Sequence, residues 1–169
     1  MIYDGIYYLL ISLKQALAVW VIIEGIIYIY NRRIVFQKIA VDFVFIMWFI
    51  TTLHITGMYN ITLSFGENAT RMAPKLIPLI GTAGGLDLAN ILLFLPFGIL
   101  LPFVIKKITW TYKKIIIAVL PIIITIEVLQ YLGGRLFDID DIISNTLGAV
   151  VGYLLQLKYQ KEFIKENRL

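Results

Sequence analysis

Apolar residues dominate five stretches of the chain, and polar or basic breaks separate them. The stretches cover residues 6–30, 37–57, 86–105, 115–132 and 141–157. A helix that crosses a bilayer needs about 20 mostly apolar residues, and the last two stretches are somewhat shorter than that. The pattern therefore predicts an all-α fold, in which residues 1–169 form a single membrane domain: a polytopic bundle of about five transmembrane helices.

Composition supports this prediction and excludes several classes of protein. Of 169 residues, 60% are hydrophobic and 15% are charged, whereas a soluble domain is about half apolar and a quarter charged. An ordinary water-soluble enzyme of this size could not keep so much apolar surface away from water. With no cysteine and one histidine, the chain offers no zinc finger, iron–sulfur site or thiol nucleophile. We expect no metal and no cofactor.

The Lys and Arg residues predict the orientation of the bundle. When the breaks are assigned alternately to two sides, one side holds 11 of these residues, the other holds 3, and Lys14 lies within the first helix. Basic residues accumulate on the cytoplasmic side of membrane proteins. We therefore expect the N-terminus outside and the C-terminus inside, and we attribute the net charge of +4 to topology rather than to nucleic-acid binding.

Polar residues recur at one depth near the outer ends of four helices. A charge at the bilayer centre costs roughly 2.5–3.5 kcal/mol on insertion scales, so each polar group in a span needs an explanation. At about 1.5 Å per residue, these groups lie roughly 5–8 Å below the outer surface. They are His54, Asn90, Glu127, Gln130 and Asn145. Glu127 and Gln130 share one helix face because they are three residues apart.

The short outer loop 133–141 is predicted to close over this layer. It carries Arg135, Asp138, Asp140 and Asp141, and an arginine guanidinium can hold a carboxylate through two hydrogen bonds. Gly133 and Gly134 allow a sharp turn, so we expect Arg135 to fold back and pair with Glu127. Asp138 and Asp141 are the rival partners for Arg135.

Simpler explanations exist for each of these residues. Asn90, Gln130 and Asn145 would also serve as hydrogen-bonding contacts between helices, and His54 as a satisfied polar group. Lys14, Glu24 and Asp42 are expected to be dispersed, with the two acids near water at the inner interface. Gly148 and Gly152 are spaced so that the fifth helix can approach a packing partner closely.

The long outer stretch 58–85 contains an apolar part that is too short to span. It runs from Met72 to Ile80 and is interrupted by Pro74 and Pro78. We expect this part to rest at the interface, or to re-enter the membrane, beside the polar layer.

Three separated motifs resemble the VanZ-like family of small bacterial membrane proteins. They are Asn90-Ile-Leu-Leu-Phe-Leu-Pro-Phe-Gly98, Glu127-Val-Leu-Gln130, and Arg135-Leu-Phe-Asp138-Ile-Asp-Asp141-Ile-Ile-Ser-Asn145-Thr-Leu-Gly148. A Leu76-Ile-Pro78-Leu segment is similar to the family pattern just upstream. The resemblance covers a core at 76–152, and residues 1–57 add two helices without a matching motif.

The resemblance implies a multi-pass protein of the bacterial cytoplasmic membrane, in a cell-envelope context associated with glycopeptide resistance and reduced teicoplanin susceptibility. It implies no particular reaction. The residues that match the family motifs are Asn90, Pro96, Gly98, Glu127, Gln130, Arg135, Asp138, Asp141, Asn145 and Gly148.

Three functions remain open from the sequence. The favoured one is a non-catalytic protein that binds the head group of a lipid or lipid-linked envelope precursor through Asn90, Glu127, Gln130, Arg135, Asp138, Asp141 and Asn145. A membrane enzyme acting on a lipid phosphate or ester would use Glu127 as acid or base. A structural or regulatory membrane partner would use the polar layer only to fix its fold.

Overall fold

Five α-helices account for most of the chain. The computed structural model describes residues 2–31, 36–61, 73–79 and 85–166. Its helices are α1 (Ile2–Asn31), α2 (Phe36–Ile55), α3 (Leu88–Val104), α4 (Tyr112–Leu132) and α5 (Ile139–Glu166), with a single 3₁₀ turn, η1 (Met58–Asn60), after α2. Each helix overlaps one of the five predicted stretches, so the all-α bundle is confirmed.

Three of the helices are long and apolar enough to cross a membrane, over Leu10–Ile29, Lys38–Ile55 and Tyr112–Leu132. The apolar helix α3 has 17 residues and measures about 26 Å, a little less than the ~30 Å hydrocarbon core. α5 falls short on composition rather than length, because its first turn is acidic and its last turns are basic and polar. The orientation of the termini stays a prediction.

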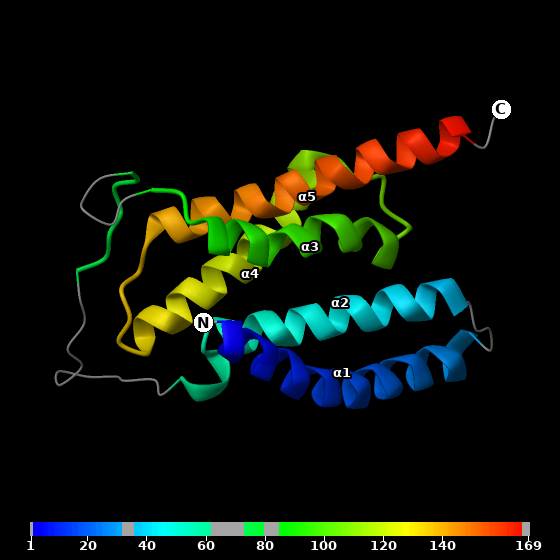
Figure 1. Cartoon of the computed structure of the whole chain (residues 1–169), viewed down its shortest axis with the longest axis horizontal. Coiled ribbons are helices and arrows are strands. Elements are labelled where there is room, and N and C mark those ends of the chain that lie inside the picture. Colours follow the sequence, from blue (N-terminus) through cyan, green and yellow to red (C-terminus); the bar gives the residue numbers. More distant parts are fainter. Residues whose placement is uncertain (1, 32–35, 62–72, 80–84, 167–169) are drawn as a thin grey trace.

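Each helix packs against one or two others, and the apolar core lies where α3, α4 and α5 meet. α1 packs on α2, α2 on α3, and α5 packs along both α3 and α4. The N-terminus and C-terminus lie toward opposite ends of the long axis (Figure 1). The core consists of apolar residues of α3, α4 and α5, backed by aromatic residues of α2; its fully buried members include Phe94, Phe97, Ile115, Val119 and Ile123.

The closest helix contact is between α3 and α5, and it requires glycine on both helices. A Cβ added to Gly98 of α3 would lie 1.9 Å from the carbonyl oxygen of Ala149. A Cβ added to Gly148 of α5 would lie 2.1 Å from the carbonyl oxygen of Ile91, and one added to Gly152 would lie 2.0 Å from that of Leu95. The neighbour of this glycine pair is therefore α3 of the same chain, which approaches it backbone to backbone.

A neighbouring helix supports α3 next to its proline break. Pro96 lies inside α3 and lacks the N–H that a helix needs at that position. The indole Nε1 of Trp48 in α2 donates to the carbonyl oxygen of Leu93 at 2.8 Å. The carbonyl that Pro96 leaves without a helical donor is that of Leu92, so the indole bond to Leu93 adds a contact between α2 and α3 beside the proline and does not replace the lost bond.

The acids of the first two helices are not dispersed, which corrects the expectation from the sequence. Asp42 is 5% exposed, forms an ion pair with Lys38, and lies close to Glu24 of α1. Glu24 Oε1 and Asp42 Oδ1 have no hydrogen-bond partner among the described residues. The helical hairpin places residues 18 positions apart against each other, a pairing that the hydropathy pattern does not contain. Burial of these carboxylates is tolerable because the Lys38 ammonium offsets their charge.

The α3–α5 contact generates a stability prediction. Gly152→Ala should lower the free energy of unfolding by about 1–3 kcal/mol, because the new methyl group meets a backbone carbonyl that cannot move aside. Thermal unfolding of the protein in detergent measures this loss. Gly25→Ala in α1 is the control, because its added methyl group has no neighbour within 4 Å. Equal stability of the two variants would contradict the packing assigned to Gly152.

Candidate functional site

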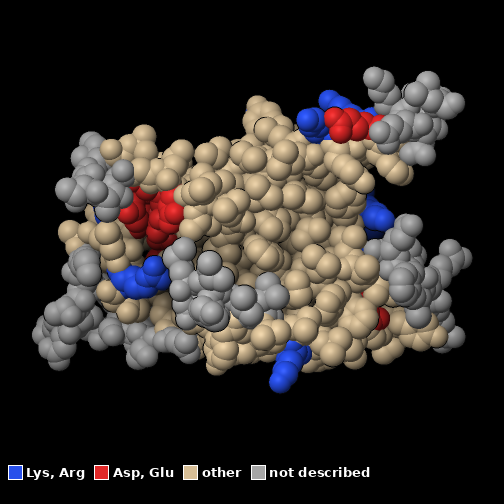
Figure 2. Space-filling view, viewed as in Figure 1, with Lys and Arg blue, Asp and Glu red and all other residues tan. Residues whose placement is uncertain are grey.

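Polar residues from α2, α3, α4 and α5 gather at the end of the molecule where α5 begins. This end also receives the segment 73–79, which precedes α3 by nine residues. Acidic side chains form one continuous surface there, while the middle of the same face is mostly uncharged (Figure 2). We call this group of side chains the acidic cluster; it comprises Asp87, Glu127, Asp138, Asp140 and Asp141.

Segment 73–79 is fastened to the start of α5 through its backbone. The Lys75 N–H donates to the carbonyl of Phe137 at 2.9 Å, and the Ile139 N–H donates to the carbonyl of Lys75 at 3.1 Å. These two bonds form an isolated parallel bridge between Lys75 and Asp138. The described part of the Met72–Ile80 segment therefore rests beside the polar layer, as predicted; Met72 and Ile80 lie outside the described residues.

Among the described residues, Lys75 is the one that forms ion pairs with the acidic cluster. Its ammonium lies 2.6 Å from Asp140 Oδ2 and 3.2 Å from Asp138 Oδ2. Asp140 also accepts the N–H groups of Leu79 at 2.9 Å and Gly85 at 3.2 Å. The Lys75 ammonium and these amides hold the pKa of the Asp140 carboxyl below its usual value. In return, the hydrogen bond to Asp140 raises the pKa of Lys75.

Two further contacts join α3 to α5 at this end. Asn90 Nδ2 donates to Asp141 Oδ1 at 2.7 Å. The backbone N–H of Asp87 donates to Ser144 Oγ at 2.9 Å, while the Asp87 side chain accepts the N–H of Ala89 and so caps α3. Asn90 therefore neutralises part of the hydrogen-bonding need of Asp141 and lies where the sequence predicted it, near the outer end of α3.

Gln130 and Arg135 meet a carbonyl at the end of α2 instead of an acid. Gln130 Nε2 donates to the carbonyl oxygen of Thr56 at 2.8 Å, and an Arg135 terminal nitrogen donates to the same oxygen at 3.2 Å. The turn after α4 makes this geometry accessible, because Gly134 has φ +88° and the Arg135 N–H bonds back to the Gln130 carbonyl. The predicted glycine turn is present, but it directs Arg135 toward α2.

Glu127 and Asn145 are buried and make few hydrogen bonds with the described residues. Glu127 is 2% exposed and accepts one long bond, from the Asp138 N–H at 3.5 Å. Asn145 is 4% exposed, and its Oδ1 has no partner among the residues that the structure describes. An unpaired buried polar atom costs free energy, so Asn145 is the predicted site residue with the clearest capacity for a ligand. The other such atoms among the described residues belong to Glu24, Asp42 and Thr146, which are not predicted site residues.

The expected Glu127–Arg135 ion pair is not formed between these described residues. Arg135 is exposed and bonds to Thr56, and it acts on Glu127 only by longer-range attraction, against repulsion from Asp141 and Asp138. Thr56 could not be recognised from the sequence as a competing acceptor, because its carbonyl becomes free only where α2 ends.

His54 is satisfied within the first two helices and takes no part in the cluster. Its Nε2 lies 2.8 Å from Gln15 Oε1 of α1, and its ring stacks on Tyr59 with centroids 4.0 Å apart. It thus has the simpler of the two roles considered from the sequence.

Sequence reasoning did not single out Lys75, Asp140, Ser144 or Thr56. Lys75 entered only as a charge in the topology count and Asp140 only as a loop acid. The one sequence signal for Lys75 was its place between Pro74 and Pro78, where prolines fix an extended backbone that is able to pair with another segment.

The cluster as a whole is suited to accept hydrogen bonds rather than to hold a metal. Among the described residues, no group of three or more His, Cys, Asp or Glu side chains is arranged to bind a metal ion. The free acceptor of Asn145 and the Glu127 carboxyl, with its one long bond, suit hydroxyl or ammonium groups, and the remaining donors of exposed Arg135 suit a phosphate or carboxylate. A head group with both kinds of function would use all three residues.

Comparison with known proteins gives one family. A family model described as VanZ/LLP1 matches residues 16–159, which includes most of α1 and all of α2 as well as the motif-bearing helices. No curated protein and no solved structure matches this chain.

Hydrogen bonding between α3 and α5 predicts which side chains are energetically coupled. In a double-mutant cycle on the free energy of unfolding, Asn90→Ala and Asp141→Ala should be coupled by about 1 kcal/mol because the two side chains are in direct contact. Glu127→Ala and Arg135→Ala should be additive within about 0.5 kcal/mol. The reverse result would restore the pairing expected from the sequence.

The Lys75–Asp140 ion pair predicts an acid-sensitive attachment of segment 73–79. The pKa of Asp140 is depressed, so the stabilisation is complete above the usual value of 3.8 and is lost as the pH falls through the lower folded value. Because the pKa of Lys75 is raised above 10.5, its contribution persists through neutral pH. Hydrogen exchange of the peptide 73–79, compared with the unprotected rate at each pH, should show protection at pH 7 that decreases as the pH falls below 3.8.

The same exchange experiment has a mutational test and a control. Lys75→Met and Asp140→Asn should lose most of the protection already at pH 7, whereas Glu162→Gln at the other end of α5 should retain it. Full protection in Lys75→Met would show that the backbone bridge alone holds the segment.

Proposed function

This chain belongs to the VanZ/LLP1 family, and we propose that it is a non-catalytic membrane protein that binds the head group of a lipid or lipid-linked envelope precursor. The proposal rests above all on one observation: the Asn145 Oδ1 atom is buried and has no hydrogen-bond partner among the described residues, while the buried Glu127 carboxyl accepts one 3.5 Å bond from them. A resident ligand that donates hydrogen bonds would remove that cost.

An apolar groove beside the site supports a lipid as the ligand. A pocket of about 390 Å³ lies between α2 and α4, lined by Phe49, Leu53, Met58, Pro121, Ile122, Thr125, Ile126 and Leu129. Its lining residues Met58 and Leu129 are two positions from Thr56 and one position from Gln130 in the sequence, so the pocket extends to the end of α4 that precedes Arg135. A molecule with its head group at Arg135 would find room for a chain directly below.

The roles that we propose for the site residues differ from residue to residue. Glu127 and Asn145 accept hydrogen bonds from hydroxyl or ammonium groups, and Arg135 pairs with a phosphate or carboxylate. Asn90, Gln130, Asp138 and Asp141 hold the walls of the site in place through their existing contacts. Because the head group would belong to the bacterial envelope, binding it is also the route by which this protein would affect teicoplanin susceptibility.

An enzyme acting on a lipid phosphate or ester is the second candidate. The specific observation in its favour is Glu127, a buried carboxyl beside the acidic cluster and thus a candidate general acid or base. The described residues do not place a hydroxyl nucleophile in contact with it, which is why we favour binding. A structural or regulatory role, the third function, would need only the helix–helix contacts.

Lipid carried through purification tests the proposal. When the protein is extracted with a small disc of its native bilayer, mass spectrometry should find one lipid class enriched over the bulk membrane. Glu127→Gln should reduce that enrichment about tenfold, because a hydrogen bond to a charged group contributes roughly 1.5–3 kcal/mol. Glu162→Gln, the same chemical change at an exposed position, should leave it unaltered.

Other outcomes would identify a rival function. Wild-type protein that carries only bulk lipid in bulk proportions would refute head-group binding. Turnover of a lipid phosphate, abolished in Glu127→Gln, would establish the enzyme. If Glu127→Gln lowers protein abundance in proportion to lipid enrichment, the residue is structural.

A further inference from the structure

A second pocket lies at the end of the molecule opposite the acidic cluster. Its volume is about 410 Å³, and it is lined by residues of the end of α3, the 105–111 loop and α5: Pro102, Phe103, Lys106, Ile108, Thr109, Trp110, Tyr153, Gln156, Leu157 and Gln160. We propose that this pocket binds the phosphate head group of an anionic phospholipid, at a site separate from the acidic cluster.

The loop that forms one wall of this pocket is held in place by hydrogen bonds from three side chains. Within the loop, Trp110 Nε1 donates to the Ile105 carbonyl at 2.9 Å. Tyr153 of α5 donates its hydroxyl to the Trp110 carbonyl at 2.8 Å. Lys114 of α4 donates to the Thr109 carbonyl at 2.6 Å. The loop is thus tied to two helices, so the pocket exists before a ligand arrives.

The side chains in the pocket offer donors and a positive charge. Lys106 supplies an ammonium group, and Gln156 is a buried polar residue, 6% exposed, whose Nε2 has only a 3.3 Å bond to Gln160 Oε1. No Asp or Glu is among the lining residues. Lysine is a common ligand of phosphate, and an amide N–H adds a second donor.

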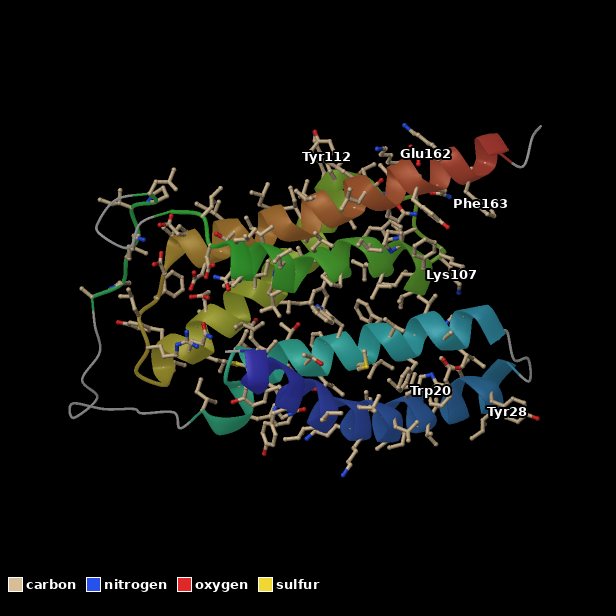
Figure 3. The ribbon with its side chains drawn as sticks, viewed as in Figure 1. Trp20, Tyr28, Lys107, Tyr112, Glu162 and Phe163 are labelled. Atoms are coloured by element: carbon tan, nitrogen blue, oxygen red, sulfur yellow. The ribbon has the colours of Figure 1, made fainter. Side chains whose placement is uncertain are left out.

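The charges around the pocket favour an anion. Lys107, Lys113 and Lys114 follow on the same loop and on the first turn of α4. Glu162, labelled with Lys107 at this end in Figure 3, forms an ion pair with Lys158 at 4.0 Å. Glu162 is two residues beyond Gln160, about 200° around the helix, so it points away from the pocket.

Apolar residues in the same pocket favour a phospholipid over free phosphate. Pro102, Phe103 and Leu157 form a wall against which the glycerol and the upper acyl chain of a lipid can pack. Basic pockets between membrane helices typically bind anionic lipid head groups. In the predicted orientation this end faces the cytoplasm, where the basic excess lies.

Lipid binding to the purified, detergent-solubilised full chain tests the proposal. Native mass spectrometry should show retention of phosphatidylglycerol but not of phosphatidylcholine, and inorganic phosphate at equal concentration should not displace the bound lipid. Lys106→Gln should weaken phosphatidylglycerol binding about fivefold, the loss of one lysine–lipid interaction of about 1 kcal/mol. Lys158→Gln removes a charge from the other side of α5 and should leave binding unchanged.

A variant that fills the pocket distinguishes binding in the pocket from general electrostatic attraction of anionic lipid to this basic end. Gln160→Trp keeps every charge, lies at an exposed rim position, and should abolish selective retention by occupying the pocket. Equal weakening in Lys106→Gln and Lys158→Gln, or undiminished retention in Gln160→Trp, would overturn the proposal. Displacement by inorganic phosphate would show an anion site without lipid specificity and would overturn it as well. Glu127→Gln should have no effect here, which distinguishes this pocket from the acidic cluster.

Discussion

The backbone-to-backbone contact of α3 with α5 is the constraint on which the rest of the structure depends. Gly98, Gly148 and Gly152 leave no room for a Cβ, and the two helices therefore lie close enough for their polar ends to interact directly. Asn90 reaches Asp141, and the Asp87 N–H reaches Ser144, only because of this approach. In a membrane, where lipid tails are as apolar as side chains, such close packing is the main source of helix association.

The acidic end shows how this family member keeps several carboxylates close together. Lys75 forms ion pairs with Asp138 and Asp140. The backbone N–H groups of Leu79 and Gly85 also donate to Asp140, and the Asn90 side chain donates to Asp141. Among the described residues, no cation forms an ion pair with Glu127. This excess of negative charge distinguishes the start of α5 from a group of polar residues that only join helices. It favours a ligand that donates hydrogen bonds.

The two ends of the bundle differ in charge and therefore in the lipid chemistry that suits them. The acidic end combines acceptors with exposed Arg135 beside an apolar groove between α2 and α4. The opposite end combines Lys106 with a preformed amphipathic pocket. A protein that contacts lipid head groups in both leaflets would be fixed in depth and tilt, since charged and polar anchors set both in membrane helices.

Hydropathy alone determined the number and order of the helices, because long apolar runs have few other stable structures in lipid. Local spacing likewise determined the turn at Gly134, the glycine face of α5 and the placement of Asn90, Glu127, Gln130 and Asn145 toward the same end of their helices. What the sequence did not contain was the choice of partner for each polar group. Arg135 contacts Thr56 rather than Glu127, Lys75 bonds to residues more than 60 positions away, and Glu24 meets Asp42. These pairings depend on which helix ends lie side by side, and only the tertiary structure decides that.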